Sequence, residues 1–363
     1  MTSRRAQRAQ VVPFDAAGRA TARAAGLRYV SDAEPGFTRV KKGKSFSYLD
    51  VRGHKLTRAA DLQRIRALAI PPAWTDVWIC AHEAGHIQAV GRDARGRKQY
   101  RYHARWSKAR DMAKHARMCD FAKRLARVRA HCRAQLQARG LGRDKVLAAL
   151  VCIADLTAIR VGHEEYTREN ASFGLTTLRK RHVQVRGARV EMHFRGKSGI
   201  VRHLAFEDRK VADVVAQCRS AAGQHLFKFR DEKGVWRRVH ADHVNAYLRG
   251  LMGQQFSLKD FRTWAATVRV AVELARSQPC STQRAIKQTI LAAVRQAAEH
   301  LGNTPAICRK SYVHPLIFEA YQQGRVLPKT PKLRDVKLTY ARHESCVRRF
   351  LLELMSAPQA RAA

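Results

Sequence analysis

The sequence predicts an α+β protein with a small β-rich N-terminal domain and a larger, mostly helical domain that contains a β-hairpin. Three observations support this fold class. In residues 26–107, apolar and polar residues alternate in short runs, as in antiparallel strands. From about residue 108, apolar residues recur at helical spacing instead. A length of 363 residues suits two domains, and a hydrophobic fraction of 45% is sufficient for their cores.

The N-terminal domain is expected to contain two hairpins, one further strand and one short helix. Its strands are expected at 37–40, 46–50, 77–80, 86–90 and 99–102. A helix is expected over 60–69, because Pro71-Pro72 cannot continue it. Residues 1–25 are rich in arginine and poor in acids. They favour a flexible basic arm, with a transit peptide as the alternative.

Residues 108–325 are expected to form the helical domain. Helices are predicted at 108–139 with a break, 143–160, 207–220, 240–251, 258–277, 281–301, 305–313 and 315–323. Ser257 and Asp260 match the acidic form of a capping box, which marks a helix start. Gly302 suits a helix stop, and Thr304-Pro305 suits the start of a helix that ends near Tyr312.

One β element interrupts these helices. Apolar residues alternate over 183–194 around Gly187, and a second strand is expected over 200–204. Lys197 lies between two glycines, which favours a tight, mobile turn. Residues 326–363 are rich in Lys, Arg and Leu, and we expect them to form a basic C-terminal extension with an appended helix.

The charge of the chain indicates a polyanionic partner. Lys and Arg number 70 against 29 Asp and Glu, which gives a formal net charge of +41. So large an excess, spread through a folded sequence, repels itself unless a polyanion balances it. Nucleic acid is the expected partner. No apolar run approaches the ~20 residues that span a bilayer, so we expect no membrane association.

Two patterns suggest cofactors and fail on closer reading. Gly43-Lys44-Ser45 and Gly196-Lys197-Ser198 resemble the end of a phosphate-binding loop, but the required upstream glycine is missing in both. Cys80, His82 and His86 lack a fourth zinc ligand at the usual spacing. We therefore expect no cofactor and no metal. The 8 cysteines are scattered and form no CxxC pair, which favours a reducing compartment and a cytoplasmic protein.

Five residues distributed along the helical domain suggest a reaction site. Arg160, Lys197, Lys259, Arg262 and Tyr312 each have an ordinary explanation when taken alone. The cations suit solvated helix ends and turns, and the tyrosine suits a core position. A tyrosine hydroxyl has a pKa of about 10 and becomes a useful nucleophile at neutral pH only when cations surround it. Together these residues are what phosphoryl transfer from DNA to protein requires.

The order and spacing of these residues resemble the type IB DNA topoisomerases, in particular the compact poxvirus-like and bacterial branch. The similarity extends over residues 26–325. The matching motifs are Arg160-Val161-Gly162, the Gly-Lys turn at Lys197, Lys-x-x-Arg at Lys259 and Arg262, Leu-Gly-x-Thr-Pro…Ser-Tyr at 301–312, 166–170 and 174–178. The resemblance implies a monomer that clamps duplex DNA and relaxes supercoils without ATP or metal. It also implies a nucleoid-associated protein.

The resemblance assigns a role to each residue of the site. Tyr312 would attack a backbone phosphorus and hold the 3′-phosphate, while Arg160 and Arg262 grip the non-bridging oxygens. Lys197 would protonate the departing 5′-oxygen, and Lys259 would assist. Asn303 stands where the family often has histidine. Its amide can donate the same hydrogen bond to phosphate but carries no charge.

A second group of residues is expected to contact DNA. The loop 91–98 is strongly basic and precedes two tyrosines, and cations beside aromatic rings suit phosphate and sugar contacts. The alternative is that these aromatics belong to the core. The full set of expected DNA contacts is Lys41, Lys42, Lys44, Arg92, Arg95, Arg97, Lys98, Tyr100, Tyr102, Tyr166, Arg179 and Lys180.

Two other functions fit part of the pattern. A tyrosine recombinase uses the same chemistry, but that class usually has histidine where this chain has Lys259. A non-catalytic nucleoid DNA-binding protein would need the charge alone. Relaxation of a plasmid by the wild type but not by Tyr312→Phe distinguishes the enzyme from the binding protein.

Overall fold

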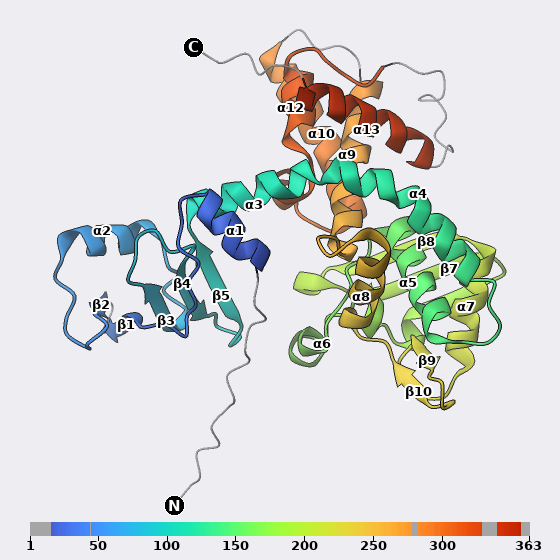
Figure 1. Cartoon of the computed structure of the whole chain (residues 1–363), viewed down its shortest axis with the longest axis horizontal. Coiled ribbons are helices and arrows are strands. Elements are labelled where there is room, and N and C mark those ends of the chain that lie inside the picture. Colours follow the sequence, from blue (N-terminus) through green and yellow to red (C-terminus); the bar gives the residue numbers. More distant parts are fainter. Residues whose placement is uncertain (1–15, 44, 278–281, 329–339, 357–363) are drawn as a thin grey trace, which may run out of the picture. The chain divides into compact units, whose positions relative to one another are not determined.

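The computed structural model describes residues 16–43, 45–277, 282–328 and 340–356. It divides into two compact units, Met1–Ala116 and Arg117–Ala363 (Figure 1). The mixed helix-and-sheet class predicted from the sequence is confirmed. None of the helices in the described part of the chain is long and apolar enough to cross a membrane.

The first unit is built on a five-stranded antiparallel sheet. Its strand order is β2-β1-β3-β4-β5. The strands are β1 (Gly36–Lys42), β2 (Ser45–Leu49), β3 (Thr75–Cys80), β4 (Ile87–Arg92) and β5 (Lys98–Tyr102). The helix α2 (Ala59–Ala67) buries Ile65 against Phe37, Val77 and Ile79 of the sheet. All five predicted strands and the short helix are present.

A second small core joins the start of the unit to its end. The helix α1 (Ala16–Ala24) packs against α3 (Ala104–Ala116) and buries Ala22 with Leu27 and Trp106. This helix differs from the flexible arm suggested by the arginine content of residues 1–25. The alanines between its arginines provide an apolar stripe that the composition alone does not reveal. Residues 1–15 lie outside the described residues.

The second unit is mostly helical (Figure 1). Its helices are α4 (Met118–Gln135), α5 (Arg143–Thr157), α6 (Glu164–Asn170), α7 (Arg209–Ser220), α8 (Ala241–Met252), α9 (Leu258–Arg276), α10 (Gln283–Leu301), α11 (Pro305–Tyr312), α12 (Pro315–Gln322) and α13 (Tyr340–Ser356). The helix α5 is apolar almost all round and lies in the centre of the core, against α4, α7, α8 and α9. The predicted break in the first long helix occurs at Arg117.

A three-stranded antiparallel sheet accompanies these helices. Its order is β6-β7-β8, with β6 (Val183–Arg186), β7 (Arg189–Arg195) and β8 (Val201–Glu207). Val190, Met192 and Phe194 of β7 are buried, as the alternation predicts. A short 3-10 turn, Lys197–Gly199, connects β7 to β8. Sequence reasoning missed α6 and the two-stranded ribbon β9 (Lys228–Arg230) and β10 (Trp236–Arg238).

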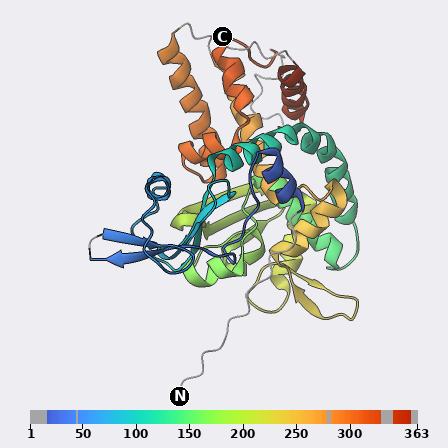
Figure 2. The ribbon, with the colours of Figure 1, turned by 60° about the vertical axis from the view of Figure 1, so that its left-hand side comes forward.

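The C-terminal helix α13 belongs to the core of the second unit. Figure 2 shows α13, in dark red, within the same group of helices as α9 and α10. Its residues Val347, Phe350 and Leu351 are buried. Arg129 of α4 pairs with Glu344 at 2.7 Å and with Asp155 of α5 at 2.7 Å. The basic composition predicted an appended helix, but these contacts integrate it.

Candidate active site

Arg160 lies in a sharply bent segment directly after α5. The helix ends at Ala158, which adopts a left-handed conformation with φ 50°. Gly162 has φ +83°, and a β-carbon there would lie 2.9 Å from the Cα atom of Gly174. The carbonyl of Arg160 accepts a hydrogen bond from the Leu175 amide at 2.8 Å. The glycines therefore allow two loops to pack closely and hold Arg160 in place.

Arg262 is the buried centre of the site. It lies one turn into α9, whose start is the predicted capping box, with Ser257 N donating to Asp260 Oδ2 at 2.8 Å. Only 3% of Arg262 is exposed. Its Nη2 donates to the Leu301 carbonyl at 3.0 Å, and its Nη1 donates to the Ala158 carbonyl. One guanidinium thus connects the ends of α5 and α10 to α9.

Tyr312 reaches Arg262 from the short helix α11. The predicted stop and start are both present: Gly302 has φ 59°, and Thr304 Oγ1 caps the next helix by accepting from Ile307 N at 3.3 Å. The Arg262 guanidinium carbon lies 5.1 Å from the centroid of the Tyr312 ring. Tyr312 is half-buried.

Arg160 and Asn303 complete the group around this turn. Nη2 of Arg160 donates to the Gly302 carbonyl at 3.2 Å and also to Oδ1 of Asn303. Because Oδ1 accepts from Arg160, the amide nitrogen Nδ2 of Asn303 is turned away from it. Nδ2 is buried and has no hydrogen-bond partner among the residues that the structure describes. A buried donor without a partner is costly, which suggests that a ligand oxygen satisfies it.

The cations change the acidity of the tyrosine. Burial alone raises the pKa of Tyr312, but the charge of Arg262 close to the ring, with the charges of Arg160 and Lys259, brings this pKa below its usual value of 10.0. Burial and the neighbouring Arg262 and Arg202 lower the pKa of Arg160 to about 10. Arg160 still remains charged at neutral pH. The site therefore favours the phenolate that a nucleophilic tyrosine must become.

The two lysines occupy different surroundings. Lys259 is exposed on α9, and its charge acts on Tyr312. Lys197 is exposed in the turn between β7 and β8. Among the described residues, its ammonium forms no hydrogen bond or ion pair. The structure thus gathers Arg160, Lys259, Arg262, Asn303 and Tyr312, and leaves Lys197 outside that group.

Sequence reasoning missed two residues beside this group, Arg202 and His300. Arg202 of β8 donates to the carbonyls of Glu299 and His300 at 3.0 and 2.6 Å. Burial and the nearby arginines 269, 202 and 262 lower the pKa of His300 to about 3. A signal for Arg202 exists in the sequence, because strand alternation places it on the same inward face as Leu204 and Phe206.

The expected DNA contacts of the first unit lie mostly on its surface. Tyr100 and Tyr102 are 41% and 46% exposed and stack with ring centroids 5.8 Å apart, so they are not core residues. Trp106, by contrast, is core. Lys98 pairs with Asp32 at 2.6 Å and Arg97 with Asp93 at 2.6 Å. The remaining expected contacts described in this unit are exposed: Lys41, Lys42, Arg92 and Arg95. Lys44 lies outside the described residues.

Two of the three expected contacts in the second unit, Arg179 and Lys180, have partners within the chain. Nη1 of Arg179 donates to Gln224 at 3.2 Å, and Lys180 donates to the Ala221 carbonyl. Tyr166 lies on α6, and its side chain is outside what the structure describes. DNA would therefore have to compete for Arg179 and Lys180.

The described residues contain no group of three or more His, Cys, Asp or Glu that could hold a metal ion. His86, part of the rejected zinc pattern, stacks on Tyr29 and accepts from Val30 N at 3.0 Å.

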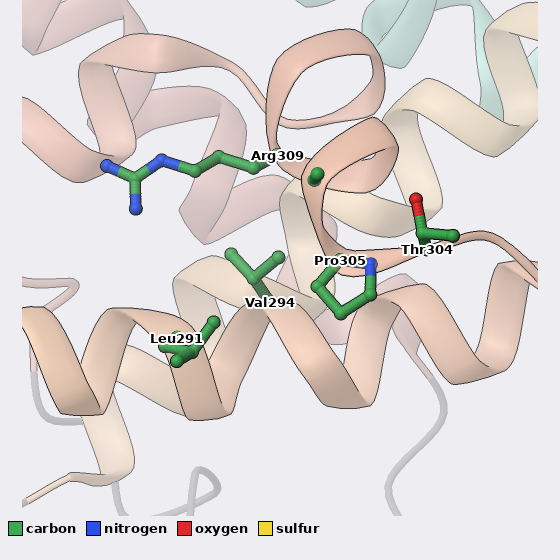
Figure 3. A pocket seen from close by; sticks show the side chains of 6 residues that line it. Leu291, Val294, Thr304, Pro305 and Arg309 are labelled. Carbon is green, nitrogen blue, oxygen red and sulfur yellow. The ribbon is translucent and has the colours of Figure 1, made fainter.

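A small apolar pocket lies between α10 and α11 (Figure 3). It is lined by Leu291, Val294, Thr304, Pro305, Ala306 and Arg309, and the side chains gathered around Tyr312 do not line it.

Comparison with known proteins decides the family. The model of the eukaryotic DNA topoisomerase I catalytic core matches residues 103–332. That of the bacterial DNA topoisomerase IB N-terminal domain matches residues 45–93. The chain belongs to the type IB DNA topoisomerase family. This type IB topoisomerase is an enzyme whose substrate is DNA, which decides against the recombinase and the non-catalytic binding protein.

Viral members of the family are similar over most of their length. DNA topoisomerase 1B of Acanthamoeba polyphaga mimivirus is 31% identical over 80% of this chain and 88% of its own. DNA topoisomerase 1B of Vaccinia virus (strain Copenhagen) is 21% identical over 66% of this chain and 73% of its own. DNA topoisomerase 1 of Rabbit fibroma virus (strain Kasza) is 22% identical over 75% and 84%. The topoisomerase described here thus spans most of each relative.

Proposed function

We propose that this topoisomerase relaxes supercoiled duplex DNA by cutting one strand, letting it rotate about the intact strand, and resealing it. The observation that carries the proposal is the buried Arg262, whose guanidinium carbon lies 5.1 Å from the centroid of the Tyr312 ring. With Arg160 and Lys259 nearby, the tyrosine stands in a field that stabilises both a phenolate and a bound phosphate.

The cleavage step forms one bond and breaks one. The Tyr312 oxygen, having lost its proton to solvent, attacks phosphorus and forms a 3′-phosphotyrosyl bond. The bond between phosphorus and the 5′-oxygen breaks, and that oxygen takes a proton from Lys197, with Lys259 assisting. Resealing is the reverse reaction. Because the phosphotyrosyl bond replaces the broken phosphodiester, the cycle requires neither ATP nor a metal ion.

The remaining groups would bind the pentavalent phosphorus. Arg160 and Arg262 would contact its non-bridging oxygens, for which planar guanidinium groups are well suited. The buried Nδ2 of Asn303, which has no partner within the described part of the chain, supports a third donor to the same oxygens. Loss of a single donor of this kind can slow a reaction by about 10² to 10³.

DNA binding is expected to depend on salt. The exposed cations of both units are proposed to contact phosphates, with the enzyme acting as a nucleoid-associated monomer. The clamp of the two units around the duplex stays a prediction. If about ten phosphates are contacted, log affinity should fall with a slope near −9 against log salt.

The decisive experiment compares the wild type with Tyr312→Phe in plasmid relaxation, in EDTA and without ATP. Relaxation by the wild type alone is expected. The covalent adduct should carry a DNA 3′-phosphate on Tyr312. Equal relaxation by both proteins, a requirement for metal or ATP, or an adduct on another residue would contradict the proposal.

A further inference from the structure

Arg202 lies just after the turn that carries Lys197. It is the second residue of β8 and lies on the inward face of that strand with Leu204 and Phe206. The turn is closed by Gly196 N, which donates to the Ile200 carbonyl at 2.8 Å. A β-carbon on Gly196 would lie 3.2 Å from Cγ of Arg202. The aliphatic part of Arg202 therefore packs directly against the backbone of the Lys197 turn.

The other end of Arg202 covers the end of α10. Its two terminal nitrogens donate to the Glu299 and His300 carbonyls at 3.0 and 2.6 Å. A β-carbon on Gly302 would lie 2.7 Å from the guanidinium carbon. Position 302 requires a glycine for two reasons. The backbone has a positive φ of 59°, and Arg202 occupies the space that a β-carbon would need.

The segment 299–303 accepts hydrogen bonds from three arginines, one after another along the chain. The carbonyls of Glu299 and His300 accept from Arg202, and that of Leu301 accepts from Arg262. The carbonyl of Gly302 and the side chain of Asn303 accept from Arg160. A displacement of the segment 299–303 would therefore change the positions of both phosphate-binding arginines and the donor on Asn303.

We infer that Arg202 is a positioning residue that couples the Lys197 turn to the segment 299–303. It holds the general acid and the phosphate-binding groups in register, although it does not itself touch the reacting atoms. This inference rests on the proposed function, because it uses the roles proposed for Lys197 and Tyr312. A substitution away from the reacting atoms that misplaces a catalytic group by about 1 Å can lower the rate by about 10²-fold.

The test uses single-turnover cleavage of two duplexes by the full chain. One duplex has the natural 5′-oxygen at the scissile bond, and the other has a bridging 5′-sulfur. A thiolate leaves without a proton, so the sulfur duplex does not require the general acid. Arg202→Ala is expected to slow cleavage of the oxygen duplex by about 10² and that of the sulfur duplex at least ~10-fold less. Arg186→Ala is the control and should match the wild type, because Arg186 is exposed on β6, at the other edge of the same sheet.

Further variants separate positioning from general destabilisation. Arg202→Lys reaches one carbonyl rather than two and should recover part of the lost rate. Gly302→Ala displaces Arg202, and adding it to Arg202→Ala should slow cleavage by less than the product of the two single effects. If Arg202→Ala does not fold, Gly302→Ala and Arg202→Lys on the two duplexes decide the question.

The outcomes distinguish two kinds of failure. If Arg202→Ala and Gly302→Ala slow both duplexes equally, or neither, the coupling is refuted while the proposed function stands. If the wild type forms no adduct on Tyr312 with either duplex, the proposed function itself fails.

Discussion

Substitution of Arg262 by lysine tests the electrostatic argument most directly. Lysine keeps the positive charge but cannot reproduce the planar fork that donates to the Ala158 and Leu301 carbonyls. Arg262 is 3% exposed, so water cannot easily replace the lost donors. Each carbonyl left without a donor costs about 1–3 kcal/mol of stability. We expect the variant to unfold at lower denaturant concentration.

The same substitution should change both the rate and its pH dependence. Loss of one positioned donor to phosphate lowers the rate of cleavage by about 10² to 10³. Arg262 is also the main group that lowers the pKa of Tyr312 against the effect of burial. When this guanidinium is lost, that pKa rises, and a larger fraction of Tyr312 stays protonated at neutral pH. The pH at which cleavage reaches half of its maximum should therefore move upward.

Single-turnover formation of the covalent adduct, measured from about pH 6 to about pH 10, gives both quantities. Arg209→Ala, an exposed arginine on α7, is the matched control. A folded Arg262→Lys enzyme whose rate stays within about tenfold of the wild type, with the same pH midpoint, would refute this account of the site.

Three further predictions follow from other contacts. His300 has its pKa lowered from 6.5 to about 3, so its contribution to stability is complete above pH 6.5 and lost as the pH falls. About 2 kcal/mol should be lost by about pH 5 in urea unfolding, and His300→Gln should remove this loss. In α13, Leu351→Ala should cost about 2–5 kcal/mol, whereas the exposed Leu352→Ala should cost less than about 0.5 kcal/mol. Asn303→Ala should slow cleavage by about 10² without weakening DNA binding, and Asn303→His should restore most of the rate.

Local sequence signals predicted the elements that position the site. The capping pattern at Ser257 and Asp260 located the start of α9, and Gly302 with Thr304-Pro305 located the boundary between α10 and α11. These signals are reliable because they depend on backbone groups within one turn of the residue concerned. The alternation along β7 was equally informative.

Contacts between distant segments could not be predicted in this way. The burial of α13 depends on partners more than two hundred residues away, such as Arg129 for Glu344. The composition of α13 resembles that of a solvated basic helix, although Val347, Phe350 and Leu351 have the helical spacing of a buried face. The packing of Arg202 on Gly302 is of the same kind, since it joins a hairpin to a helix end. The position of Lys197 likewise depends on the hairpin as a whole.

The choice of partners for the arginines explains how the site remains strongly positive. Arg160, Arg202 and Arg262 donate to carbonyls at the ends of α5 and α10, where unpaired carbonyls carry partial negative charge. Within the described part of the chain, none of the three forms an ion pair with a carboxylate. A carboxylate would hold a guanidinium equally well, but it would cancel the charge that lowers the pKa of Tyr312 and attracts phosphate. Helix ends thus fix the cations while leaving most of their charge available for chemistry.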